Sequence, residues 1–364
     1  MTLKRLFIQH LRNLGAVDIT PSEQVNLIYG ENGSGKTSIL EAINVLGVGR
    51  SFRSHKHKPL INHHQTSFMV FGKVNAEGAE VPVGVNRQAN GEAVFKANGM
   101  LVSSAAMLAS YLPLQVINSD TFLLLEGSPK IRRQFMDWLV FHVEPGFFQV
   151  WKDAQRCLKH RNSLLRRDRM DRFELATWDK ELAQYSQQIH VFRQECMSQF
   201  CDTFYSLVEE FIAIEGVSLT YYCGWDQEKD YATILADNLE RDKRQGFTQV
   251  GSHRADLRIT INGYPAAEVL SRGQQKLLVC ALKIAQGYLF SKITGRRCIY
   301  LIDDLPAELD EHHRSLLVRW LDAMETQTFV TGVEKQALLD AWQELPATEI
   351  KLFHVEQGNV QAIV

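Results

Sequence analysis

The stretch that decides the fold of this 364-residue chain is Gly30-Glu31-Asn32-Gly33-Ser34-Gly35-Lys36-Thr37. It matches G-x-x-x-x-G-K-[ST], the pattern of a phosphate-binding loop between a strand and a helix. A short apolar run, 25–29, precedes it, and apolar residues at helical spacing follow it over 38–46. Glycines allow backbone N–H groups to close around phosphate oxygens without a Cβ in the way. The sequence therefore predicts a strand, a phosphate-binding loop and a helix, in that order.

The residue types in this loop suit the phosphates of a nucleotide. Lys36 is expected to reach the β- and γ-phosphates, and the Thr37 hydroxyl is expected to bind Mg²⁺. The helix that follows points its positive end at the anion. The candidate nucleotide-contacting residues are Gly30, Glu31, Asn32, Gly33, Ser34, Gly35, Lys36, Thr37 and Ser38.

The composition is that of an ordinary globular protein, with 45% hydrophobic residues, 23% charged residues and a net charge of −2. Because there is no global basic field, any surface for nucleic acid must be local. The first ten residues are broken by charge and lack the core of a signal peptide, and we expect no apolar run long enough to span a bilayer. A cytoplasmic protein without a membrane partner is predicted. The cysteines form no C-x-x-C pair, which favours buried apolar filler over a zinc site.

The chain divides into three segments by its patterns. Residues 1–120 hold short strands and the phosphate-binding loop. Residues 121–215 carry long helical patterns, with a helix start at Pro129. Residues 216–364 return to short apolar strands. We predict an α/β fold with an inserted, mainly helical second lobe, and we find no heptad run long enough for a coiled-coil arm.

Two segments concentrate basic residues. The loop 49–58 contains Arg50, Arg53 and Lys56, and the helical segment 156–172 contains Arg166, Arg167 and Arg169. A solvated connector and a solvated helix face explain these charges. The alternative interpretation is contact with phosphates, those of nucleotide or DNA for the loop, while a solvated face is the default for the helical segment. These six residues are therefore candidate DNA contacts, and both interpretations stay open from composition alone.

Two carboxylates end the apolar strand predicted at 299–302, which is a Walker B pattern. Asp303 is expected to hold Mg²⁺ directly or through water. Asp304, one residue further, is placed to polarise an attacking water. Asp304 and Lys36 are therefore the candidate catalytic residues, and Thr37 and Asp303 are the candidate metal ligands.

The stretch 270–276 lies just before a predicted helix, where Ser271 and the Gly273 backbone can take an anion. It resembles L-S-x-G-Q, the signature motif of the ABC ATPase superfamily, and 307–310 resembles the D-loop that follows Walker B in that superfamily. The resemblance implies an ABC-type P-loop ATPase head, a mixed sheet flanked by helices, that binds ATP and Mg²⁺. It also implies that Ser271, Gly273 and Gln274 act on ATP held by another copy, so that ATP drives formation of a homodimer.

The chain further resembles the RecF family of DNA repair ATPases over nearly its whole length. Besides the motifs above, the resemblance is carried by 49–53, 126–129, Arg132-Arg133 and 251–254. The chain departs from the family pattern at Ser252 and Ala255, where the family usually has Pro and Asp. Thr331 stands where transporters carry a switch histidine, and Gln115 is a candidate for the Gln loop.

This second resemblance implies a function in recombinational repair and replication restart. Family members bind double-stranded DNA and junctions of single- and double-stranded DNA when ATP drives them to dimerise, and they hydrolyse ATP slowly. With RecO and RecR they help to load RecA at single-stranded gaps, in connection with the SOS response. Two alternatives remain open at this point, the ATPase subunit of a membrane transporter and a kinase built on a phosphate-binding loop.

Overall fold

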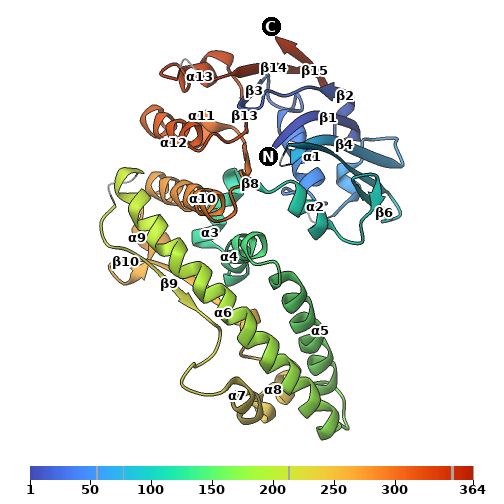
Figure 1. Cartoon of the computed structure of the whole chain (residues 1–364), viewed down its shortest axis with the longest axis vertical. Coiled ribbons are helices and arrows are strands. Elements are labelled where there is room, and N and C mark those ends of the chain that lie inside the picture. Colours follow the sequence, from blue (N-terminus) through green and yellow to red (C-terminus); the bar gives the residue numbers. More distant parts are fainter. Residues whose placement is uncertain (55, 77, 212–213, 346–347, 364) are drawn as a thin grey trace. The chain divides into compact units, whose positions relative to one another are not determined.

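The computed structural model describes residues 1–54, 56–76, 78–211, 214–345 and 348–363 (Figure 1). The chain forms two compact units. The first unit comprises Met1–Thr121 and Lys276–Val364, and the second comprises Phe122–Gln275. The sequence placed the start of the second lobe at 121, beside this junction, and its end at 215, which lies inside the second unit.

The first unit contains a six-stranded antiparallel sheet of order β2-β1-β4-β5-β6-β7. Side chains alternate between its two faces, so that Leu6, Ile8, Val70 and Val83 point into the core and are fully buried. The strands are β1 (Thr2–Leu11), β2 (Leu14–Ile19), β4 (Ser67–Ala76), β5 (Ala79–Gln88), β6 (Ala93–Ala97) and β7 (Met100–Leu101). The short strands predicted for this region are confirmed, and they pair antiparallel.

A second six-stranded sheet, of order β15-β14-β3-β13-β12-β8, is parallel except for its edge strand β15. All four residues of β12 are buried, which explains its uninterrupted apolar sequence. Strands β3 and β12 lie on either side of β13, so that their carboxyl ends meet at one edge of the sheet. The strands are β3 (Val25–Tyr29), β8 (Leu114–Ile117), β12 (Ile299–Ile302), β13 (Thr328–Gly332), β14 (Ile350–Glu356) and β15 (Asn359–Ile363).

Helix α1 (Lys36–Val48) shares one hydrophobic core with both sheets. Its buried Ile39, Ile43 and Leu46 belong to the same cluster as residues of β1, β4 and β12. The remaining helical segments of this unit are η1 (Lys58–Leu60), α2 (Ala105–Tyr111), α11 (Leu305–Glu308), α12 (Glu311–Ala323) and α13 (Lys335–Asp340). Two further segments, η2 (Ser119–Phe122) and α10 (Arg272–Thr294), continue from one unit into the other.

The second unit is built on α4 (Pro129–Val143), α5 (Phe147–Leu165) and α6 (Arg172–Phe211). Helices α5 and α6 lie side by side, and their pairing ends with the 19 residues of α5, which is too short for a long coiled coil (Figure 1). The other elements are α3 (Leu123–Glu126), α7 (Tyr231–Asp237), α8 (Leu239–Gln245), η3 (Ser252–Arg254), α9 (Ala266–Val269), β9 (Val217–Tyr222), β10 (Asp256–Ile261) and β11 (Tyr264–Pro265).

Arginine ion pairs, one of them with a buried arginine, explain why this unit continues beyond residue 215. Arg193 of α6, only 2% exposed, donates to Asp137 of α4 and to the carbonyl of Ser252. Arg132 of α4 donates to both oxygens of Asp256, at 2.7 and 3.0 Å. Breaking a buried ion pair by removing one partner typically costs about 3–5 kcal/mol. The helices before 215 and the strands after it are therefore held in one unit.

Helix α10 corrects the expectation that no apolar run is long enough to span a bilayer. By length and composition it is long and apolar enough to cross a membrane, with a mean hydropathy of 1.3 over an 18-residue window. However, 67% of that window is buried inside the protein. Core helices of globular proteins pass the same test, so the helix is weak evidence for a membrane span.

Candidate functional site

The loop between β3 and α1 adopts a conformation that its glycines make possible. Gly30, Gly33 and Gly35 all have positive φ angles, of 151°, 81° and 122°. A Cβ on Gly30 would lie only 2.2 Å from the carbonyl oxygen of Val355, so this position cannot carry a side chain. The loop therefore exposes backbone rather than side chains, as contact with a phosphate requires.

Lys36 begins α1 and turns back over the loop. Its ammonium group donates to the carbonyl oxygens of Gly30 and Glu31, at 2.7 and 2.9 Å. Desolvation lowers the pKa of Lys36, while the nearby carboxylates of Asp304 and Asp303 raise it. The amine thus lies in the loop with two acidic neighbours that favour its charged form.

Three side chains from separate segments meet at the carboxyl ends of the parallel strands. The hydroxyl groups of Thr37 and Thr331 both donate to the same oxygen of Asp303, at 3.0 and 2.7 Å. The Thr331 hydroxyl also accepts from the backbone N–H of Asp304, at 2.8 Å. Asp304 has a φ of 52°, in the left-handed region that non-glycine residues rarely occupy. Hydroxyl and carboxylate oxygens suit Mg²⁺, so the groups of Thr37 and Asp303 fit the predicted ion.

The sequence missed the role of Asn13. This residue lies in the turn between β1 and β2, and its side-chain amide donates to the carbonyl oxygens of Gly33 and Ser34, at 3.1 and 3.0 Å. Its side-chain oxygen accepts from the Ser38 hydroxyl at 2.9 Å. From the turn between β14 and β15, the Gly358 N–H donates to the Ser34 carbonyl at 2.8 Å. Two turns remote in sequence therefore hold the phosphate-binding loop.

These residues surround a cavity of about 510 Å³ in the first unit. Arg12 lines it and forms two 2.8 Å hydrogen bonds with Glu41, a fully buried residue that also accepts from the Ser51 hydroxyl. The full lining is Arg12, Asn13, Asn32, Gly33, Gly35, Lys36, Thr37, Ser38, Arg53, Pro59, Ile61, Asn62, His63, Asp303, Asp304 and Thr331. Most of the residues predicted in the loop and at Walker B are thus brought together.

The three basic residues of the 49–58 loop that are candidate DNA contacts lie in different surroundings in the structure. Arg53 lines the cavity, although it was predicted as a DNA contact. Lys56 is exposed and is absent from the lining, and the Arg50 carbonyl accepts from the Asn44 side chain at 2.7 Å. Gln115 is buried in β8, donates to Gln286 and does not line the cavity, so its candidacy for a Gln loop there is wrong.

The signature residues belong to the second unit. Ser271, Gly273 and Gln274 are exposed at the start of α10. The Ser271 N–H donates to the Gln274 side chain, and the Gln274 N–H donates to the Ser271 hydroxyl. A Cβ added to Gly273 would meet nothing within 4 Å. None of the three lines the cavity of the first unit.

Two of the basic residues between α5 and α6 form polar contacts with nearby residues of the second unit. Arg166 donates to the carbonyl of Gly246 at 3.1 Å, and Arg167 pairs with Glu174 at 3.4 Å. Arg169 is exposed. With acidic residues interleaved, this segment is less positive than its arginines alone suggest.

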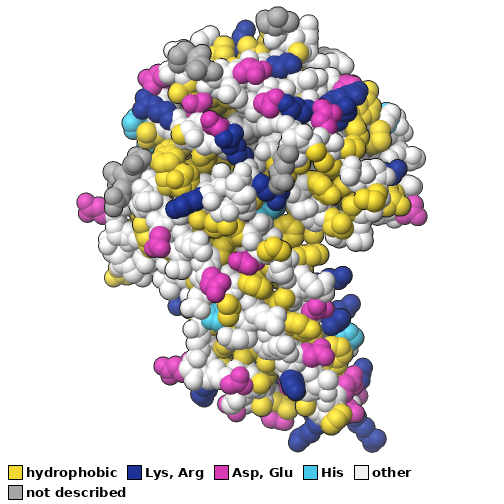
Figure 2. Space-filling view, viewed as in Figure 1, with side chains coloured by type: hydrophobic (Ala, Val, Ile, Leu, Met, Phe, Trp, Pro, Cys, Tyr) yellow, Lys and Arg dark blue, Asp and Glu magenta, His cyan; other side chains and the backbone are white. Residues whose placement is uncertain are grey.

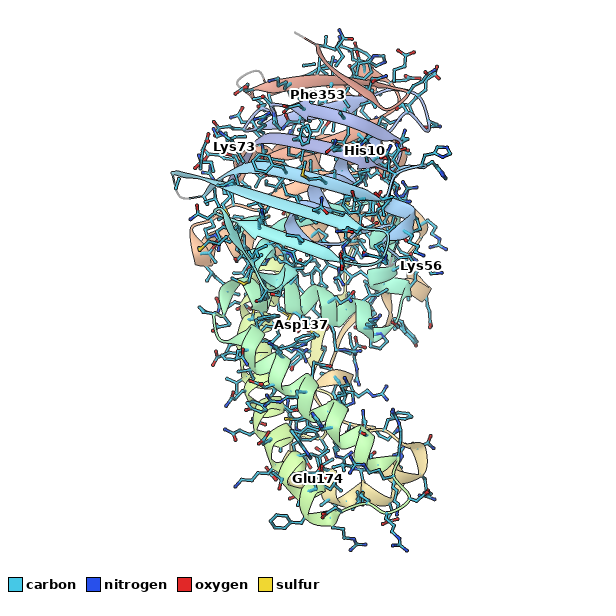
Figure 3. The ribbon with its side chains drawn as sticks, turned by 90° about the vertical axis from the view of Figure 1, so that its right-hand side faces the viewer. His10, Lys56, Lys73, Asp137, Glu174 and Phe353 are labelled. Carbon is cyan, nitrogen blue, oxygen red and sulfur yellow. The ribbon has the colours of Figure 1, made fainter. Side chains whose placement is uncertain are left out.

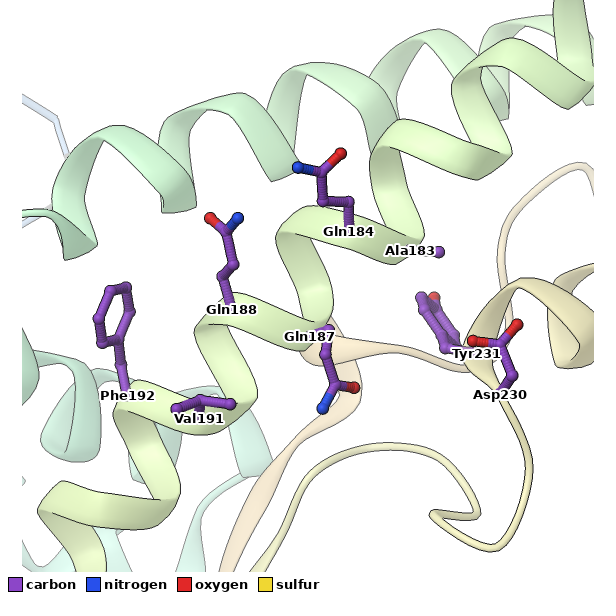
Figure 4. A pocket seen from close by; sticks show the side chains of 8 residues that line it. All are labelled: Ala183, Gln184, Gln187, Gln188, Val191, Phe192, Asp230 and Tyr231. Carbon is purple, nitrogen blue, oxygen red and sulfur yellow. The ribbon is translucent and has the colours of Figure 1, made fainter.

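A different hollow, beside α6, offers a comparison (Figure 4). It is lined by Gln184, Gln187 and Gln188, by apolar side chains, and by Asp230 and Tyr231 at the start of α7. Among the described residues that line it none is basic, and Asp230 is the one with a charged side chain. Such a hollow does not suit phosphate, so the cavity at Lys36 is the candidate site.

Comparison with known proteins agrees with this geometry. A family model described as RecF/RecN/SMC N terminal domain matches residues 2–361. Over 361 residues the chain is 66% identical to the DNA replication and repair protein RecF of Cellvibrio japonicus (strain Ueda107), covering 99% of both chains. The chain belongs to the RecF family. A RecF from Pseudomonas aeruginosa (strain LESB58) is 47% identical over 361 residues, covering 99% of this chain and 97% of that protein.

Solved structures support the same membership. The recombination mediator protein RecF with ATP, of the RecFOR pathway, is similar with a TM-score of 0.89 and 26% identity, covering 100% of this chain and 98% of that one. An Smc head bound to the C-winged helix domain of ScpA has a TM-score of 0.59 and 15% identity, covering 100% and 98%, and shows likeness of fold alone. The predicted ATPase head of the RecF family is confirmed, which sets aside the transporter and kinase alternatives.

Proposed function

We propose that the cavity at Lys36 binds ATP with Mg²⁺ and that this binding switches the protein onto DNA during repair. The observation that carries the proposal is the meeting of Thr37, Thr331 and Asp303 beside the Lys36 ammonium. Its support from comparison is the similarity to a RecF solved with ATP. Pro59, Ile61, Asn62 and His63 also line the cavity, and we assign them to the nucleoside.

Five residues of the cavity have a part in this reaction. Lys36 would exchange its contacts with the loop carbonyls for phosphate oxygens. Thr37 and Asp303 would hold Mg²⁺, which supplies positive charge to the phosphates when bound. Asp304, held by Thr331, would orient the attacking water as a general base. The result is a slow ATPase that acts as a switch.

A second copy of the chain would complete the site. Ser271, Gly273 and Gln274 are exposed and line no part of their own chain's cavity, so they are free to contact a phosphate held by another copy. A triphosphate between two copies would be contacted by both and would hold them together. ATP would thus drive formation of a homodimer.

The proposed partner of the dimer is double-stranded DNA, including its junctions with single strands, in the cytoplasm. Arg50, Lys56, Arg166, Arg167 and Arg169 remain the proposed DNA contacts. Arg53, which lines the cavity, is proposed to contact the nucleotide instead. Contacts of this kind go mainly to phosphates and weaken with salt. Family membership extends the proposal to RecR and RecO as partners that help to load RecA at gaps, within the SOS response.

The dimer can be tested by changing Ser271 to Arg. The variant should bind a fluorescent ATP analogue as the wild type does, because Ser271 lies outside the cavity of its own chain. It should sediment as a monomer in saturating Mg·ATP, whereas the wild type sediments as a dimer. An ATP-dependent dimer of the variant would remove the signature residues from the interface, and a wild type that stays monomeric with ATP and DNA would refute the proposed switch.

A further inference from the structure

Part of the outward face of the antiparallel sheet, around Met69 and Phe71, is apolar. In β4 the run Phe68-Met69-Val70-Phe71 supplies both faces, since Phe68 and Val70 are buried in the core while Met69 and Phe71 alternate with them on the other side. An antiparallel sheet with one solvated face normally places polar residues outward. Strand β4 therefore has the sequence of a strand that is covered on both faces. Figure 3 shows this sheet facing the viewer.

Strand register extends this apolar face across the sheet. Phe71 lies opposite Phe7 in β1 and Gly84 in β5, Gly84 lies opposite Lys96 in β6, and Lys96 lies opposite Leu101 in β7. Directly paired residues present their side chains on the same face. Leu101 is 73% exposed, and a Cβ added to Gly84 would meet nothing closer than 3.9 Å. The row is thus open to solvent, and its surface is lowest at Gly84, which has no side chain.

A hollow of about 490 Å³ lies over this row. Its described lining residues come from β4, β5, β6 and the turn at Gly99, so no other described segment of the first unit contributes to it. Figure 2 shows hydrophobic side chains gathered over the region of β4 and β6, on the right of that view. Contiguous exposed apolar patches are a common feature of interaction sites in soluble proteins.

The charges of the lining residues limit which kind of molecule can bind in the hollow. Lys96 is the one charged side chain among the described lining residues, and no carboxylate lines the hollow. Lys73, on the same face, is by contrast paired with Glu80 at 3.1 Å. A single cation does not suit a nucleic acid backbone, which needs several. A second copy of the hollow offers no carboxylate among its described lining residues either, so pairing the hollow with itself would leave both Lys96 side chains without an acidic partner.

We propose that this hollow is a docking site for an extended, apolar segment of a partner protein that carries a carboxylate for Lys96. A flat sheet face with a glycine at its centre admits a strand-like peptide, whose alternate side chains enter the hollow. The carboxylate at Lys96 fixes the position of that peptide along the row. The site is separate from the nucleotide cavity, and no lining residue is shared between them.

The test uses the full chain without nucleotide and two fluorescent dodecapeptides. One contains Asp, Leu, Phe and Gly, and the other has Lys in place of each Asp. Fluorescence anisotropy should show tighter binding of the Asp peptide. Lys96→Glu should weaken that binding by about tenfold and favour the Lys peptide instead, because an attractive pair becomes a repulsive one. Lys335→Glu, the same charge change on α13, should have no effect.

A second variant tests the apolar part of the site. Phe71→Ser should weaken binding of the Asp peptide by at least about tenfold, since the apolar contact of an aromatic side chain is lost. Unchanged thermal unfolding of each variant establishes that the fold is intact. The proposal is overturned if wild type, Lys96→Glu and Lys335→Glu bind the Asp peptide equally. It is also overturned if the wild type self-associates without nucleotide and Phe71→Ser abolishes that association.

Discussion

The hydroxyl group of Thr331 offers the sharpest test of the candidate site, through the change Thr331→Val. Valine keeps the shape and the β-branch of this residue, which is only 1% exposed in β13. It removes the donor to Asp303 at 2.7 Å and the acceptor of the Asp304 N–H at 2.8 Å. The change therefore acts on hydrogen bonds and not on packing.

The magnitude follows from those two bonds. A hydrogen bond to a charged group contributes about 1.5–3 kcal/mol, and a buried N–H left without a partner costs about 1–3 kcal/mol. The two terms share one hydroxyl and are not additive, so we expect a loss of about 2–4 kcal/mol in the free energy of unfolding. Asp304 also loses a contact that holds its left-handed backbone. If about 2 kcal/mol of this loss is added to the activation free energy of hydrolysis, the turnover rate of ATP falls about 30-fold.

The assay pairs steady-state ATP hydrolysis with urea unfolding, and Thr328→Val is the matched control. Thr328 lies in the same strand with the same 1% exposure, but its hydroxyl makes only a 3.3 Å bond to the Thr326 carbonyl. Nucleotide affinity should change little in Thr331→Val, because Lys36 and Thr37 are untouched. Equal turnover in the two variants would refute the role of Thr331 in positioning Asp304.

Three further changes test other parts of the site. Lys36→Ala should abolish binding of a fluorescent ATP analogue, because this ammonium is the cation inside the loop; retained nucleotide affinity would contradict its assignment. Asn13→Ala removes three hydrogen bonds to the loop and helix, so it should weaken nucleotide affinity by about tenfold in the same titration. An unchanged affinity would contradict the supporting role of Asn13. Glu substitutions at Arg166, Arg167 and Arg169 should lower duplex affinity and flatten its salt dependence in anisotropy titrations while basal hydrolysis stays the same; an unaltered salt slope would make the segment merely solvated.

The sequence predicts the parts of the site that are local in the chain. The phosphate-binding loop is a contiguous pattern, and its conformation depends on glycines that sit at fixed positions within it. Asp303 and Asp304 follow directly from an apolar strand that ends in two acids. That the two motifs meet at one edge depends on β3 and β12 being parallel strands of one sheet, which the structure shows.

The parts that the sequence missed are single polar residues brought in from a distance. Asn13 and Gly358 lie in hairpin turns, where Asn and Gly are ordinary turn residues and give no sign of a second role. Thr331 is an unremarkable strand residue until β13 is seen between β3 and β12. In the sequence Arg53 is one of several basic residues of a loop, and only the fold shows that it lines the cavity. Contacts of this kind depend on tertiary structure, which no local pattern encodes.

The two missed turns also depend on each other. Gly358 has a φ of 81°, and a Cβ there would lie 2.2 Å from the backbone oxygen of Asn13. The turn between β14 and β15 can therefore approach both Asn13 and the Ser34 carbonyl only because residue 358 has no side chain. A two-residue hairpin turn favours glycine at this φ even as a free tip, so it is the close contact with Asn13 that sets this turn apart. Gly358 thus belongs with Asn13 to the support of the phosphate-binding loop, although it lies more than 300 residues further along the chain.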